Sequence, residues 1–347
     1  MKPRILACLI ALLGPTTVIT PVAQAATTYT DGLAIPSRLQ WNGNYGYCGE
    51  VSFISAGLYY GQYLSQYDAR AIASKNARQS ITSSQLLLGV NDEYAARSLR
   101  LRYEKPKKPI SRSLFLAWVK GKLISGVPVI IGVYMNQTRF YGTSNLNAGD
   151  TEYDHIVTVT GFESTHTPSV PATYYPDDII TIEDHGLWTG TTSGIPPYFF
   201  RYPVGTFQKT RKGANAKTAE VYSLRSSRNY GIAITGILDN DGKTVPVRLT
   251  TSQNSETPAI VDGSNTRPAA TPLTLTITMS GLAPGVDYNL YRYNTVANVP
   301  IASFNANAAK AANKWTVKIS SGSTYSQTMT IMSNETAIFR ALPASAP

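Results

Sequence analysis

The chain has one cysteine beyond its first 25 residues, and that cysteine lies where a thiol becomes reactive. Cys48 follows a glycine-punctuated segment, 41–47, and precedes a run, 51–60, whose apolar spacing predicts a helix. The free N–H groups and the dipole at a helix start favour the thiolate over the thiol. Since no second cysteine is available for an internal disulfide, Cys48 is either a buried apolar side chain or a reactive thiol. Its position at the helix start favours a nucleophile.

A thiolate nucleophile needs a base held rigidly beside it. Beyond the first 25 residues the chain has three histidines, His155, His166 and His185. His155 opens a β-branched run, 155–162, that predicts a core strand, so we expect it to be the base. His166 lies in a polar loop and is expected at the surface, while His185 follows the next predicted strand and is the second choice.

The base in turn needs a group that orients its ring. Asp184 comes directly after the predicted strand 178–183 and is our candidate. Asp177 and Asp178 are rivals, but both lie at the start of that strand rather than its end. Two other acids, Glu50 and Glu183, are expected to be structural or to face solvent.

An acyl-transfer site also needs donors for the developing oxyanion. The backbone N–H of Cys48 is one candidate, and the second is a side-chain amide from Gln40, Asn42 or Asn44. The residues leave the choice among these three amides open. A metal site is weakly supported, because no H-x-x-x-H spacing occurs and Cys48 has no paired cysteine. We therefore expect no metal and no cofactor.

This arrangement resembles the papain-like cysteine peptidase superfamily, and within it the C39-like branch, over about residues 40–235. The resemblance rests on Cys48-Gly49 at a helix start, on the pattern His-apolar-Val-x-Val-x-Gly from His155, and on a strand ending at Asp184. It implies that these three residues are nucleophile, base and orienting acid. The family usually has a glutamine about six residues before the cysteine, where this chain has Asn42.

The order of predicted elements indicates an α+β fold. Helices are expected at 48–65, 68–78, 84–99 and 111–126, and strands at 127–135, 155–162, 178–183, 198–207 and 230–235. The resemblance implies that the helices pack on an antiparallel sheet. After residue 237, short strands alternate with turns, which is typical of an all-β sandwich. Leu282–Tyr288 resembles the L-x-P-G-x-x-Y turn of fibronectin type III-like domains, in which the tyrosine hydroxyl ties down a strand corner.

The chain therefore divides into a signal peptide (1–25), a papain-like domain (26–236) and a β-sandwich domain (237–347) that we expect to fold independently. Residues 1–25 have a basic start, an apolar core and an Ala23-Gln24-Ala25 cleavage site, so we expect secretion after cleavage near Ala25. No later run is apolar enough for a transmembrane helix. Removing Lys2 and Arg4 lowers the net charge of +10 to +8, and no nucleic-acid-binding motif accompanies it.

These observations predict a secreted cysteine peptidase whose partner is a protein or peptide substrate. One alternative keeps the same three residues but makes the enzyme a cell-wall amidase or a transglutaminase-like acyl transferase. Another is a secreted binding protein with no enzymatic activity. On every alternative, the C-terminal domain suggests a surface or macromolecular partner.

Overall fold

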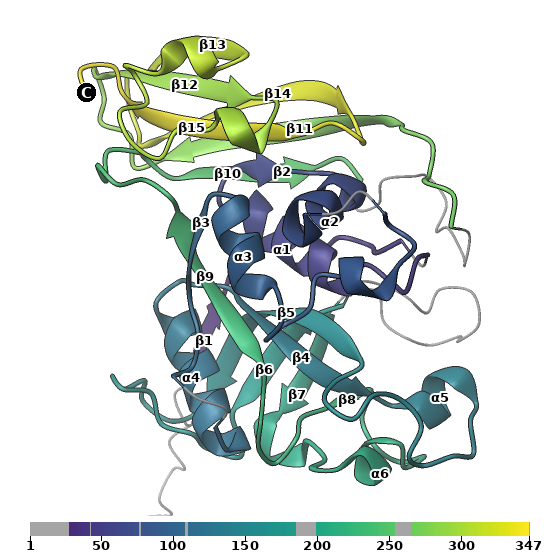
Figure 1. Ribbon diagram of the computed structural model, residues 1–347. Helices are drawn as coiled ribbons and strands as arrows, with labels where there is room; N and C mark the ends of the chain where they lie inside the picture. The colour runs from purple at the N-terminus through teal and green to yellow at the C-terminus, as the bar shows by residue number, and fades with distance from the viewer. Residues whose placement is uncertain are drawn as a thin grey trace, which may run out of the picture.

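The computed structural model describes residues 28–41, 43–75, 78–107, 110–184, 199–253 and 265–346. The predicted signal peptide lies outside these ranges, as do the candidates Asn42 and His185. Within them, no helix combines the length and the apolar character needed to cross a bilayer. The described residues form six α-helices and several antiparallel sheets, which confirms the α+β class (Figure 1).

The larger sheet has the strand order β3-β9-β4-β5-β6-β7, and every neighbouring pair is antiparallel. A short strand, β1, pairs with β5, and another, β8, pairs with β4. The bounds are β1 Tyr29–Gly32, β3 Leu101–Glu104, β4 Val129–Met135, β5 His155–Ser164, β6 Ile179–Glu183, β7 Phe199–Pro203, β8 Tyr222–Ser223 and β9 Gly231–Ile237.

Helices cover both faces of this sheet. Because successive side chains of a strand point to opposite faces, neighbouring residues of a buried strand pack against different helices. Ile131 of β4 packs with α4, whereas its neighbour Ile130 packs with the group formed by α1 and α3. The helices are α1 Cys48–Leu58, α2 Gln66–Ser74, α3 Asp92–Ser98, α4 Arg112–Ile124, α5 Gln137–Tyr141 and α6 Arg211–Ala214. In Figure 1, α1, α2 and α3 lie between the larger sheet and the C-terminal sheets.

The helix expected over 84–99 is much shorter, and the reason bears on the site. Only Asp92–Ser98 is helical, and a 3-10 turn occupies Thr82–Ser84. Between them, Gly89 has a left-handed φ of 77°, which interrupts a helix, and side chains bind the backbone N–H groups. The Glu50 carboxylate accepts the N–H of Leu86 at 3.0 Å, and the Asn91 side chain accepts that of Leu87 at 2.8 Å. Residues 85–91 consequently form an irregular loop over the start of α1.

Most of the C-terminal half lies in two sheets with a core between them, as expected for a sandwich, and Leu58 and Tyr63 of the N-terminal half also belong to that core. One has the order β10-β11-β14 and the other β13-β12-β15-β2. The bounds are β2 Gln62–Tyr63, β10 Val247–Thr251, β11 Pro272–Ser280, β12 Asp287–Tyr293, β13 Asn313–Lys318, β14 Thr324–Met332 and β15 Ala337–Pro343. The Tyr288 hydroxyl accepts the N–H of Ala283 at 2.9 Å, which confirms the structural role expected for this tyrosine.

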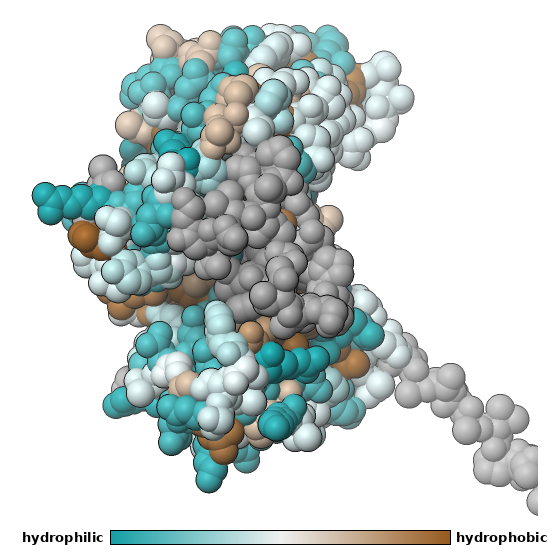
Figure 2. All heavy atoms as spheres, turned by 90° about the vertical axis from the view of Figure 1, so that its right-hand side faces the viewer, coloured by the Kyte–Doolittle hydropathy of each residue, from teal (hydrophilic) through white to brown (hydrophobic). Residues whose placement is uncertain are grey.

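The second of these sheets crosses the expected domain boundary. Its edge strand β2 comes from the N-terminal half, where Ala337 pairs with Tyr63. One hydrophobic core also joins the halves, with Phe53 of α1 packed in the same cluster as Tyr291 and Ile338. Figure 2 shows the resulting surface, with the C-terminal sheets at the top and the larger sheet at the bottom. Independent folding of residues 237–347 stays a prediction, and the shared strand and core weigh against it.

Candidate active site

Cys48 is the first residue of α1, and its thiol is partly exposed beside a cleft of about 390 Å³. The residues from Gly49 to Leu58 are all buried, so the helix is a central element rather than a surface one. Gly49 is required by close approach, because a Cβ there would lie 2.0 Å from the carbonyl oxygen of Leu86. The loop 85–91 therefore presses on the helix start and forms one wall of the cleft.

His155 is the first residue of β5, and the register of the sheet brings Asp184 to it. Thr158 of β5 pairs with Glu183 of β6, which places the next residue, Asp184, opposite Val157. Val157 and His155 are two positions apart and share a face of the strand. Accordingly Nε2 of His155 lies 3.5 Å from Oδ1 of Asp184, and both side chains are 1% exposed.

The histidine ring lies between the thiol and the carboxylate. Burial opposes a charge on His155, but hydrogen bonds to Asp184 and Cys48 outweigh it and raise its pKa from 6.5 to about 9. Because Nε2 faces Asp184, Nδ1 is the ring nitrogen that remains for the thiol proton. The structure thus brings together all three residues expected to act, although they lie far apart in the sequence.

The rival acids and the second histidine have other partners. Asp177 pairs with His166 at 3.0 Å on the surface, as expected for a surface histidine. Asp178 forms a buried ion pair with Lys120 at 2.7 Å. His185, the second choice for the base, lies outside the described residues.

Two of the three oxyanion candidates can be placed. The Asn44 amide is buried and donates to the Tyr47 hydroxyl at 3.4 Å, so it is directed into the loop rather than the cleft. Gln40 is also buried, and its Nε2 would lie 3.4 Å from a Cβ added at Gly46, so it adjoins the loop before Cys48. Neither amide is among the residues that line the cleft, so the choice of oxyanion donor stays a prediction. Asn42 lies outside the described residues.

Glu50 and Glu183 are structural, as expected, but neither faces solvent. Glu50 pairs with Arg70 at 2.7 Å in the interior. Arg70 also donates to the carbonyls of Asn44 and Gln79, at 2.7 and 3.1 Å, and to that of Gly46. This buried pair therefore shapes the loop before the cysteine.

Glu183 is directed to the opposite side of β6 from Asp184, where it meets α1. It accepts the N–H of Arg38 at 2.9 Å and the hydroxyl of Ser55 at 3.2 Å. Burial outweighs these hydrogen bonds and raises its pKa to about 8, so the carboxyl is largely protonated at neutral pH. It fixes the backbone just before Gln40.

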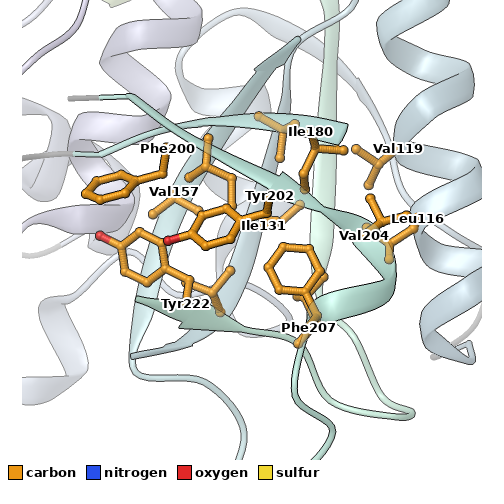
Figure 3. Packing of buried hydrophobic residues seen from close by; sticks show 14 of the residues in the cluster. Leu116, Val119, Ile131, Val157, Ile180, Phe200, Tyr202, Val204, Phe207 and Tyr222 are labelled. Carbon is orange, nitrogen blue, oxygen red and sulfur yellow. The ribbon is translucent and has the colours of Figure 1, made fainter. Parts of the chain in front are cut away.

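Aromatic side chains that the sequence did not single out surround the base. The rings of His155 and Tyr222 are 5.6 Å apart between centroids, and Tyr222 is buried. Figure 3 shows Tyr222, Tyr202 and Phe200 together at one end of a core cluster. Burial raises the pKa of the Tyr202 hydroxyl, and the Asp184 charge adds to the effect. The available sequence signal was the alternation of Phe200 and Tyr202 with the polar Arg201, but that alternation cannot identify the partner strand.

The cleft beside Cys48 has walls from two loops. One is the loop 85–90 and the other is 150–154, and Tyr153 joins them by donating to the carbonyl of Leu88 at 2.9 Å. Among the described residues, exposed apolar side chains gather here. Tyr45 and Val90, both in the cleft lining, are 63% and 75% exposed. Tyr141 is 60% exposed as a whole residue, and its hydroxyl has a raised pKa through partial desolvation first and then through the charges of Asp154 and of a thiolate at Cys48.

Comparison of the sequence with protein-family models finds no match, and comparison with curated proteins finds none either. The residues themselves must therefore carry the functional argument. Among the described residues, no group of three or more His, Cys, Asp or Glu side chains is arranged to hold a metal ion.

Proposed function

We propose that this protein is a secreted, papain-like cysteine peptidase that hydrolyses peptide bonds. The observation that carries the proposal is the buried imidazole of His155, which lies between the Cys48 thiol and the Asp184 carboxylate. A structural cysteine has no need of a charged histidine in the interior, because burying that charge costs several kcal/mol without a compensating partner. Activating a thiol does require that arrangement.

The reaction would proceed through an acyl-enzyme. The Cys48 sulfur attacks the substrate carbonyl carbon and forms a thioester as the C–N bond breaks. His155 gives its proton to the leaving amine, and Asp184 keeps the ring oriented. Water then attacks the thioester and gives a proton to His155. The carboxylic acid leaves, and the thiolate–imidazolium pair is restored.

Two exposed apolar side chains in the cleft favour a polypeptide over a cell-wall substrate. Exposed Tyr45 and Val90 flank the nucleophile, and such apolar side chains gain most by covering apolar residues of a partner. An amidase or acyl transferase acting through the same three residues is the second candidate. It keeps the first chemical step and differs only in the acyl donor or acceptor.

The test is hydrolysis of labelled casein by the purified protein, with product masses determined. Wild type should release peptides with free amino termini, and Cys48→Ala and His155→Ala should release none. His166→Ala is the matched control, since it removes a histidine that also pairs with an aspartate but lies at the surface. Full casein hydrolysis by Cys48→Ala would refute the proposal. Release of muropeptides from cell wall by wild type, with casein left intact, would favour the amidase.

A further inference from the structure

The segment that follows residue 264 in the C-terminal half reaches back to the loop before the nucleophile. Oδ1 of Asn265 accepts a hydrogen bond from the backbone N–H of Asn44 at 2.8 Å. Two residues later, Arg267 donates to the Ser65 hydroxyl at 3.2 Å. Both contacts join the connection between β10 and β11 to the N-terminal half.

Arg267 also begins a series of stacked groups that ends beside Cys48. Its guanidinium carbon lies 4.4 Å from the centre of the Tyr67 ring. Tyr67 stacks on Trp41 with centroids 6.4 Å apart, and Trp41 stacks on Tyr47 at 4.8 Å. Tyr47 is the residue before the cysteine, and the guanidinium of Arg70 lies 3.6 Å from its ring centre. Stacked planar groups restrict one another's tilt, so the series links the C-terminal half to the helix start.

The loop that receives these contacts has a strained backbone. Asn44 and Tyr45 have φ angles of 48° and 70°, followed by Gly46 at 84°. Left-handed backbone is tolerated by glycine and asparagine but is unfavourable for a tyrosine, so Tyr45 keeps it only where surrounding contacts impose it. Arg70 binds the carbonyls of Asn44 and Gly46, and Asn265 binds the N–H of Asn44. Asn265 therefore supplies the restraint on the donor side of this loop.

We infer that Asn265 and Arg267 are positioning residues for the nucleophile, which makes the C-terminal half a part of the active-site scaffold. They touch neither the thiol nor the cleft, and act through the loop 43–47. The inference rests on the proposed function as far as catalysis is concerned. The ordering of the loop can be measured without any substrate.

The experiment compares Asn265→Ala with Asn265→Asp in the full chain. Only an acceptor is needed at this position, so the aspartate should serve and the alanine should fail. With iodoacetamide at pH 6 as the probe, we expect Asn265→Ala to alkylate Cys48 about 3- to 10-fold more slowly than wild type, the effect of one lost hydrogen bond. Asn265→Asp should stay within about twofold. Hydrogen exchange of the peptide covering 43–49 should be faster in Asn265→Ala alone.

The matched control is Thr278→Ala, which removes a 3.2 Å hydroxyl contact with Ser326 on the exposed face of the same half. It should change neither measurement. The inference is overturned if Asn265→Ala exchanges 43–49 at the wild-type rate, or if Asn265→Asp is as impaired as the alanine. If wild-type Cys48 reacts no faster than a free thiol, the proposed function fails. Hydrogen exchange still decides the inference in that case.

Discussion

Replacing Asp184 by asparagine should lower the pH at which His155 loses its proton. The ring has a pKa near 9 in place of 6.5, a difference of roughly 2.5 pH units or about 3 kcal/mol in favour of the imidazolium. Burial acts against this increase, so Asp184 and Cys48 together contribute more than the net difference, and the hydrogen bond to Asp184 is the largest single contribution that raises the pKa. The carboxylate favours the charged ring, and its removal should therefore lower the pKa by at least about one pH unit, or about 1.4 kcal/mol.

Two alkylating reagents report this proton without a substrate. Iodoacetate is negatively charged and is attracted by the imidazolium beside the thiolate, whereas iodoacetamide is neutral. The ratio of their rates with Cys48 should fall as pH rises, with a midpoint near 9 in wild type. In Asp184→Asn the midpoint should be at about 8 or below. Asp177→Asn, which disrupts the exposed pair with His166, is the control and should leave the midpoint unchanged. An unchanged midpoint in Asp184→Asn would show that this carboxylate does not hold the proton on the ring.

Three further predictions concern the scaffold. Gly49→Ala should displace the helix start and reduce the rate of Cys48 alkylation at pH 6. Gly32→Ala is the control, because nothing lies within 4 Å of its added carbon, and it should leave that rate unchanged. Equal alkylation rates in the two variants would contradict the crowding at Leu86. Arg70→Met should lower the urea-unfolding free energy by about 3 kcal/mol because it leaves Glu50 buried without its cation. Arg97→Met, which removes the cation of the exposed Arg97–Glu93 pair, should change the unfolding free energy little. Equal losses of unfolding free energy in the two variants would contradict the role given to burial. A chain ending at residue 236 should fail to fold, because β2 loses its partner strand and α1 loses part of the core it packs in. A cooperative thermal transition in that fragment would instead support two independently folding domains divided at residue 237.

The candidate site was predictable wherever chemistry and local pattern coincide. Cys48 at a helix start and His155 at the head of a β-branched run follow from nearby residues alone. Asp184 required only that the next strand pair beside β5, which consecutive strands commonly do.

The predictions from the sequence failed where contacts with residues far away in the chain decide the local structure. The loop 85–91 begins with good helix formers, yet Gly89 has a left-handed φ of 77°, and the carboxylate of Glu50, 36 positions before Leu86, binds the Leu86 N–H. Strand β2 is only two residues long, and its partner is near the other end of the chain. Asn265 could not have been connected to the nucleophile by any spacing rule, because its contact with Asn44 joins positions 221 residues apart.

The pairing of β2 with β15 also means that the candidate active site cannot be fully supported until the last part of the chain has been made. Arg340 of β15 donates to the carbonyl of Tyr60, 280 positions earlier, just after the helix that begins at Cys48. A chain is synthesised from its N-terminus, so the thiol emerges long before the last strand that completes its support. Until then Cys48 belongs to an unfinished scaffold, and under the proposed function the chain would stay inactive towards itself and its neighbours during synthesis. By the same reasoning, a truncation that removes β15 would take away the partner of β2 and the support it gives to the end of α1.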